Sequence, residues 1–314
     1  MKDHFRISAT GSSANYLPEY VARELGFMAD EGIEVDSWVP NPWTGVLQDI
    51  NSSAAEAALG GIWVPAMLFN RVHNYRVFAQ LNARFPMALL GREVLQPFDW
   101  HLLEEKVVLV PGSGGVAPFQ FLAGLLREHG IRLPSITFVH DLSGDLLAQM
   151  FGGGTGDFLL LDELTATSLA RRGVGHVVAH LAETGGPMPN SVYYAPSTLL
   201  EREDRLAWRF TNALRRAMAW LADHPARDLE DLLHRRWPDV ELDIAVEVVD
   251  GFRRSGVWTG VLVEPTAYMR WQNMVIAGGV IAAPVSYSAL VDTRPAEAAQ
   301  TSDGMPQLHT SAIS

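Results

Sequence analysis

The sequence predicts an α/β protein of two lobes, each a mostly parallel sheet flanked by helices. Strand and helix patterns alternate along the first 80 residues, and the same alternation restarts at Val107 after a break. The chain has 314 residues, of which 48% are hydrophobic. This is enough apolar material for two domains with cores of their own.

The first lobe is predicted from its alternating pattern. An apolar run at 5–9 indicates a strand, and a turn at 10–15 follows it. Leu17, Val21 and Leu25 recur at helical spacing on one face, with Glu19, Arg23 and Glu24 on the opposite one. The elements expected after this helix are a strand at 33–38, a helix at 44–50, a strand at 54–59, a helix at 62–69 and a strand at 76–80.

The second lobe is predicted to begin with a strand at 107–110 and the glycine-rich turn 111–115. A helix then runs to Gly130, followed by a strand at 136–139, a helix at 143–151 and a strand at 158–161. The last third is helical, with one apolar stripe made by Leu206, Phe210, Leu214, Met218 and Leu221. Further helices are expected near 226–235, 242–254 and 266–277. The composition after Thr293 predicts a flexible tail at 293–314.

The charge composition excludes several partners and chemistries. The net charge of −12 repels nucleic acid and anionic membranes, so neither is an expected partner. Without cysteine there is no disulfide, thiolate metal site or cysteine nucleophile. The only lysines are Lys2 and Lys106, and the ten histidines form no metal-ligand motif. We therefore expect neither a metal nor a cofactor.

The N-terminal residues contain no apolar segment typical of a secretory leader. This predicts a cytoplasmic protein as the chain stands, and a periplasmic one if a leader has been removed. The longest apolar stretch, at 274–285, contains glycines and a proline and is too short to span a bilayer. Membrane insertion is not expected.

Candidate ligand-binding residues follow from the predicted sheets, because ligands of parallel α/β sheets bind beyond the carboxyl ends of the strands. Four such ends are readable, two in each lobe. Their residues are Thr10, Ser12, Ser13, Asn15, Gly61, Trp63, Ser113, Gly114, Gly115 and Asp162. For each glycine- or serine-rich turn, a plain tight turn is the alternative. Trp43, where a loop enters a helix, is a further candidate, with a packing role equally open.

Residues 15–35 resemble the opening of the binding proteins for sulfonates, nitrate and thiamine-pyrimidine precursors. The similarity lies in a ligand loop leading into a helix, then Gly26-Phe27, Glu31-Gly32-Ile33 and Val35. It implies a type II periplasmic-binding fold, as in solute-binding proteins of ABC transporters. Lobe I would comprise 1–87 and 189–292, lobe II would comprise 88–188, and two crossover strands would form the hinge. The resemblance also implies ligand contacts at Ser12, Asn15, Trp63, Ser113, Gly114 and Asn190.

Two functions remain open from the sequence. In the first, the protein closes by hinge motion around one anionic or planar aromatic small molecule, and an ABC permease is the partner that this function implies. In the second, it is a cytoplasmic enzyme on the same fold: a decarboxylase, hydrolase or isomerase that needs neither lysine nor cysteine. The missing leader favours the enzyme, and the missing catalytic constellation favours the binding protein.

Overall fold

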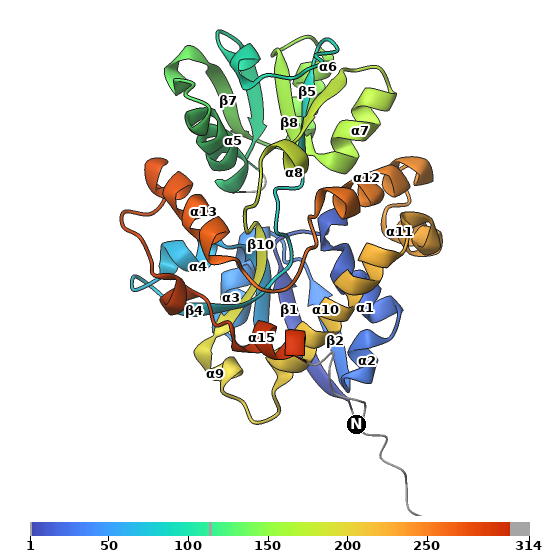
Figure 1. Cartoon of the computed structure of the whole chain (residues 1–314), viewed down its shortest axis with the longest axis vertical. Helices are drawn as coiled ribbons and strands as arrows, with labels where there is room; N and C mark the ends of the chain where they lie inside the picture. Colours follow the sequence, from blue (N-terminus) through green and yellow to red (C-terminus); the bar gives the residue numbers. More distant parts are fainter. Residues whose placement is uncertain (1, 113–114, 302–314) are drawn as a thin grey trace, which may run out of the picture.

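The computed structural model describes residues 2–112 and 115–301, which fold into two lobes joined at a narrow waist (Figure 1). Each lobe is built on a five-stranded sheet. The spatial order of the first sheet is β2 (Ile33–Trp38), β1 (Asp3–Ala9), β3 (Ala57–Gly61), β10 (Ser191–Pro196) and β4 (Tyr75–Gln80). The second sheet has the order β7 (Thr137–Leu142), β6 (Val107–Pro111), β8 (Phe158–Asp162), β5 (Met87–Gly91) and β9 (His176–His180).

Each sheet contains one antiparallel strand, and that strand is the one that enters the lobe from the waist. β10 is antiparallel to β3 and β4, and β5 is antiparallel to β8 and β9. The remaining neighbours, β1 with β2 and β3, and β6 with β7 and β8, are parallel. The prediction of mostly parallel sheets is confirmed, and the carboxyl ends of the parallel strands in both lobes point towards the waist.

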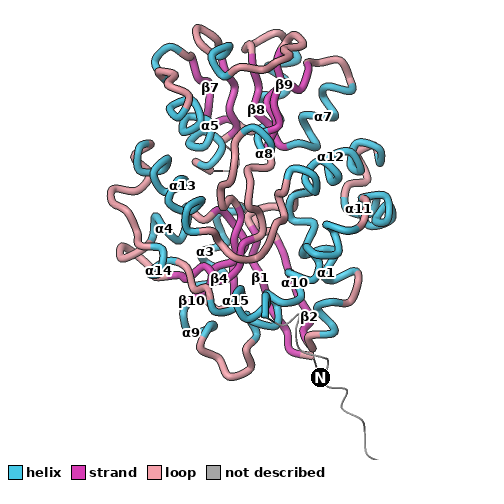
Figure 2. Tube along the Cα trace, viewed as in Figure 1, coloured by secondary structure: helices cyan, strands magenta, loops and turns pink. Residues whose placement is uncertain are grey.

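The helices cover the faces of both sheets (Figure 2). Around the first sheet lie α1 (Leu17–Glu24), α2 (Phe27–Asp30), α3 (Val46–Asn51), α4 (Trp63–Leu68), α9 (Ser197–Leu200), α10 (Leu206–Asp223), α11 (Glu230–Arg236), α14 (Tyr287–Leu290) and α15 (Arg294–Thr301). Around the second lie α5 (Ala117–Glu128), α6 (Gly144–Gly152), α7 (Glu163–Arg171) and α8 (Leu181–Thr184), while α12 (Leu242–Ser255) and α13 (Pro265–Ala277) flank the waist. Among the residues described, no helix is both long and apolar enough to cross a bilayer.

Helix α10 supplies much of the first lobe's core. All five residues of its predicted apolar stripe are buried, so that prediction is confirmed. The Phe210 ring meets the Phe5 ring of β1 edge-on at 4.9 Å and the Tyr193 ring of β10 at 4.7 Å. Apolar burial of this kind is the dominant force that holds a helix on a sheet.

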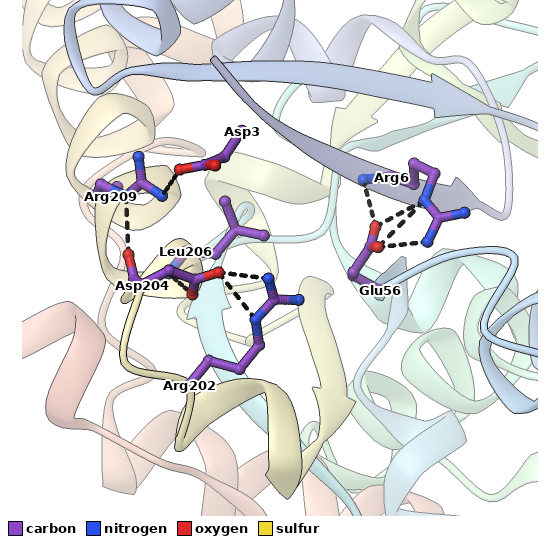
Figure 3. Close-up of polar contacts among 7 residues, drawn as sticks. All are labelled: Asp3, Arg6, Glu56, Arg202, Asp204, Leu206 and Arg209. Carbon is purple, nitrogen blue, oxygen red and sulfur yellow. Dashed lines mark hydrogen bonds and ion pairs between the residues drawn. The ribbon is translucent and has the colours of Figure 1, made fainter. Parts of the chain in front are cut away.

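Polar contacts fix the ends of the first sheet farthest from the waist (Figure 3). Arg209 of α10 donates to Asp3 Oδ2 at 2.6 Å, which ties the helix to the first residue of β1. Farther along β1, the backbone and guanidinium of Arg6 both donate to Glu56, at 2.8 and 2.5 Å. Because Glu56 directly precedes β3, this pair joins the two parallel strands and leaves their carboxyl ends free.

The structure of the first lobe differs from the sequence pattern in two places. Residues 294–301 are not a flexible tail but form α15, whose Ala296 and Ala299 are 2% exposed and pack against α10; residues 302–314 lie outside the described part. The polar side of α1 is also not uniformly solvent-facing. Glu19 is 1% exposed, whereas Leu25 of the expected apolar face is 38% exposed. The 3.6-residue pattern could not anticipate a carboxyl group buried through a tertiary hydrogen bond.

Two C-terminal helices contact both lobes at the waist. Helix α13 packs against α5 of the second lobe, where Arg270 donates to both oxygens of Glu128 at 2.8 and 2.6 Å. On the other side α12 packs against α7, and Arg171 pairs with Glu247. These helices therefore bridge the lobes rather than belonging to the first lobe alone.

His180 lies in this second bridge, where its Nδ1 is 2.9 Å from Glu163 Oε2. The hydrogen bond to Glu163, together with the charges of Glu183 and Glu247, raises the pKa of His180 above its ordinary 6.5. Arg254 of α12 lines the same small hollow. Because the pKa is higher in the folded state, the stabilisation is fully present below pH about 6.5 and is lost as pH rises through the folded-state value.

We therefore expect His180→Gln to lower the free energy of unfolding most in mildly acidic solution and least in alkaline solution. Urea denaturation of both proteins across this pH range measures the difference. Glu163→Gln serves as the matched control, since it removes the partner and should abolish the same pH dependence. A constant difference between wild type and His180→Gln at all pH values would contradict this account.

Candidate ligand-binding cleft

A cavity of about 500 Å³ lies between the two lobes at the carboxyl ends of the strands. This volume is within the usual range for sites that take small organic ligands. Of the candidates predicted from the sequence, the cavity is lined by Thr10, Ser12, Ser13, Asn15, Gly61, Trp63, Asp162 and Asn190. Their role in binding a solute remains a prediction.

The loop between β1 and α1 forms one wall of the cavity. It leaves β1 at Thr10, whose backbone N–H donates to Leu59 O at 2.9 Å, so the loop emerges beside the end of β3. Asn15 is buried. Its amide donates to Asn82 Oδ1 at 2.7 Å, and Asn82 Nδ2 donates back to Asn15 O at 2.8 Å. The indole of Trp258 donates to the same carbonyl at 2.9 Å.

Asn82 also connects this loop to both crossovers, residues 81–86 and 185–190. Its backbone N–H donates to Ser191 O at 3.2 Å, and its carbonyl accepts from Asn190 N at 3.0 Å. Asn82 is fully buried. The binding loop and the two chain segments that link the lobes are therefore held by one polar network.

Trp63 spans the cavity from the first lobe towards the second. It begins α4 directly after β3, and its half-buried indole lies between two glycines. A methyl group at Gly61 would lie 2.5 Å from Trp63 Nε1, and one at Gly115 would lie 2.7 Å from Cζ2. Both distances are far shorter than a van der Waals contact, so only glycine leaves room for the ring. Gly115 also has φ +69°, which side chains other than glycine rarely adopt.

The second lobe contributes Asp162, which ends β8 and caps α7. Its Oδ1 accepts a hydrogen bond from Thr165 N at 3.0 Å. Pro111 and Gly144 line the same side of the cavity. The predicted residues Ser113 and Gly114 lie outside the described residues, and Gly115 touches Trp63 without being a lining residue itself.

Trp43 is not among the residues that line the cavity. It lies in a 3-10 turn, η2 (Trp43–Gly45), which follows β2 at the edge of the first sheet. The candidate role of Trp43 was based on its position in a loop that enters a helix. Because β2 is an edge strand, that loop runs along the rim of the sheet rather than beside β3 and β10 at its centre.

Some lining residues were not predicted. Phe85 and Pro86 come from the first crossover, Met87 begins β5, and Trp237 and Val240 come from the segment after α11. All five lie in or next to irregular backbone, where no strand or helix periodicity marks them. The one available signal is the aromatic residue beside a proline, at 85–86 and 237–238.

The cavity wall carries little charge. Among the described lining residues Asp162 is the one charged side chain, with no lysine, arginine or histidine beside it. The remaining polar groups are hydroxyls, amides and backbone N–H groups, and Tyr16, Trp63, Phe85 and Trp237 add aromatic surface. Such a wall can stack on a planar group and can hydrogen-bond polar atoms, including those of an anion. The described part of the wall contains no acid–base pair for proton transfer.

The two sheets are joined by paired crossovers and enclose a cavity between them. This is the two-lobed architecture of periplasmic binding proteins. The predicted fold class is thus confirmed. A family model described as "NMT1/THI5 like" matches residues 13–228, which is more than half of the chain. The chain belongs to the NMT1/THI5-like family, and the resemblance noted at residues 15–35 is confirmed.

Individual relatives agree with this assignment. The "Putative binding protein YtlA" of Bacillus subtilis (strain 168) is 27% identical over 301 residues, covering 93% of this chain and 88% of that protein. The aliphatic sulphonate binding protein SsuA of Escherichia coli superposes with a TM-score of 0.69 at 12% identity, over 92% of this chain and 97% of SsuA. The desulfurization enzyme DSZB superposes with a TM-score of 0.66 at 16% identity, over 96% of this chain and 100% of DSZB. At these identities the structural likeness shows the fold alone.

The packing of Trp63 can be tested with a matched pair of glycine substitutions in the same cavity. Gly61→Ala should displace the indole, because the new methyl group would lie 2.5 Å from it. We expect a changed tryptophan emission spectrum and a loss of stability of about 1–3 kcal/mol, as for other overpacked sites. Gly11→Ala is the control, since nothing lies within 4 Å of the methyl group it adds. Equal effects of the two substitutions would contradict the described position of the ring.

Proposed function

We propose that this protein is the solute-binding component of an ABC-type importer and that its lobes close around one small molecule with a planar or anionic group. The observation that carries the proposal is the 500 Å³ cavity, whose wall is shared by two lobes that are connected through only two crossovers. Lobes joined in this way can rotate about a few backbone positions. Membership of the NMT1/THI5-like family and the likeness to YtlA support the same function.

The composition of the cavity wall limits the chemical class of the solute. Trp63 offers an aromatic face, and the 10–15 loop offers hydroxyls and backbone N–H groups. Without a lysine or arginine among the described lining residues, an anionic group would be held by these neutral donors, as occurs at loops that open a helix. The solute is therefore expected to be flat and polar, with at most a small net charge.

The fold also occurs in an enzyme, DSZB, so fold alone does not decide between binding and catalysis. The absence of cysteine and the lack of an acid–base pair in the described wall favour binding. A permease partner and a location outside the cytoplasmic membrane are parts of this proposal, because a solute-binding component meets its importer there.

A thermal-shift screen against aliphatic sulfonates, aromatic carboxylates, pyrimidines and nitrate tests the proposal. A true solute at 100 times its dissociation constant should stabilise the protein by about 2.7 kcal/mol and should be recovered unchanged. If a solute is instead converted to a product at a steady rate, the protein is an enzyme and the proposal fails.

Trp63→Ala should weaken binding of that solute by about 1–3 kcal/mol, as expected when an aromatic anchor is truncated. Phe210→Ala is the comparison, because a fully buried ring should cost about 3–5 kcal/mol of stability without a matching change in affinity. Isothermal titration and urea denaturation of both variants separate the two effects. If Trp63→Ala unfolds the protein while its folded fraction binds normally, Trp63 is a core residue.

A further inference from the structure

A second, smaller chamber of about 180 Å³ adjoins the cleft beneath α1. It lies between that helix and the carboxyl ends of β1 and β2. Gly11, Ser12 and Tyr16 line both the chamber and the interlobe cavity, so the two spaces adjoin at the loop that follows β1. A water molecule occupies about 30 Å³ of liquid. The chamber thus has room for several waters or for one small functional group.

The chamber is distinguished by the carboxyl group of Glu19, which is 1% exposed and lines it. One oxygen, Oε2, accepts a hydrogen bond from Tyr193 Oη at 2.7 Å. The other, Oε1, is buried, and no hydrogen bond of normal geometry reaches it from the described residues. A buried polar atom without a partner is costly, and most such atoms in folded proteins are satisfied by protein, water or ligand.

The surroundings of Glu19 act on its pKa in opposite directions. Burial raises the pKa and is the larger effect, whereas Tyr193, Ser37 and the positive charges of Arg23 and Arg236 lower it. Burial thus opposes the ionised form, and a further donor at Oε1 would offset that cost and favour the carboxylate. This favours a group in the chamber that presents an N–H or O–H.

The opposite walls of the chamber present donors. Ser12 and Ser37 contribute hydroxyls, and the exposed side chains of Arg23 and Arg236 stand at the outer mouth. The Arg236 guanidinium is held over the Tyr20 ring, 4.0 Å from its centre. An ammonium group in the chamber would be repelled by the two arginines, and a carboxylate would be repelled by Glu19. A group with a donor and an acceptor side by side suits both walls.

We propose that this chamber is a subsite for a carboxamide or ureido substituent, whose N–H donates to Glu19 Oε1 and whose carbonyl oxygen faces the arginines. The proposal deepens the proposed function and rests on it, because the substituent would extend from a solute held in the interlobe cavity. It adds a specific requirement: the preferred solute carries a neutral amide-like group, not only a flat polar ring.

The test uses three small probes that each carry one methyl group: acetamide, acetate and methylammonium. Saturation-transfer NMR on the methyl signal measures their binding to the whole protein. Wild type should bind acetamide most tightly of the three. In Glu19→Gln, which keeps an acceptor for Tyr193 but can present an N–H₂ to the chamber, acetamide should bind roughly tenfold more weakly and acetate should gain. If this variant does not fold, Arg236→Met at the exposed mouth should weaken acetamide binding several-fold.

Glu163→Gln is the matched control, since this buried carboxyl group lines neither the interlobe cavity nor the chamber, and it should leave acetamide binding unchanged. If Trp63→Ala abolishes acetamide binding and Glu19→Gln does not, the probe binds in the interlobe cavity. That result would overturn the subsite and leave the proposed function standing. Acetamide binding that Glu19→Gln leaves unchanged would overturn the subsite, whereas conversion of a solute to a product in the screen would overturn the proposed function, so the two failures are read from different measurements.

Discussion

The reciprocal hydrogen bonds between Asn15 and Asn82 are the interaction on which the cleft depends. The Asn15 amide donates to Asn82 Oδ1 at 2.7 Å, and Asn82 Nδ2 donates to the backbone carbonyl of Asn15 at 2.8 Å, so the β1–α1 loop is fixed to the first crossover. The backbone of Asn82 then binds the second crossover at Asn190 and Ser191. Removal of the Asn82 side chain would leave the Asn15 amide N–H without this acceptor and the Asn15 carbonyl without this donor, and a buried unpaired group costs about 1–3 kcal/mol. The ligand-facing loop thus cannot shift independently of the waist.

The rest of the cleft is arranged around that fixed point. Strand β3 ends in Gly61 so that Trp63 can fold back across it, and Gly115 of the second lobe accepts the far edge of the same ring. Helices α12 and α13 bridge the lobes on either side through Glu247 and Arg270. The relative position of the lobes therefore depends on polar pairs at the surface, on the Trp63 ring within the cavity and on the apolar packing of α13 against α5, where Trp271 meets Phe121.

The sequence predicted what periodicity and turn chemistry can reveal. The sequence pattern predicted the alternation of strands and helices, the apolar stripe of α10 and the strand ends that meet at the waist. Eight of the predicted residues line one cavity. Trp43 was misplaced because the spatial order of strands is not local information: an edge strand and a central strand look alike in sequence. Glu19 and Asn82 were missed because their significance lies in contacts with residues 174 and 67 positions away along the chain.

The central claim is that one solute is held by both lobes at once, and hydrogen–deuterium exchange tests it most directly. The measurement compares the protein with and without the solute that gives the largest thermal shift. Our account predicts slower amide exchange in the loop at 10–16 and at 61–64 of the first lobe, and in the segments at 115–118 and 162–165 of the second. Protection confined to one lobe, or located away from the waist, would contradict it.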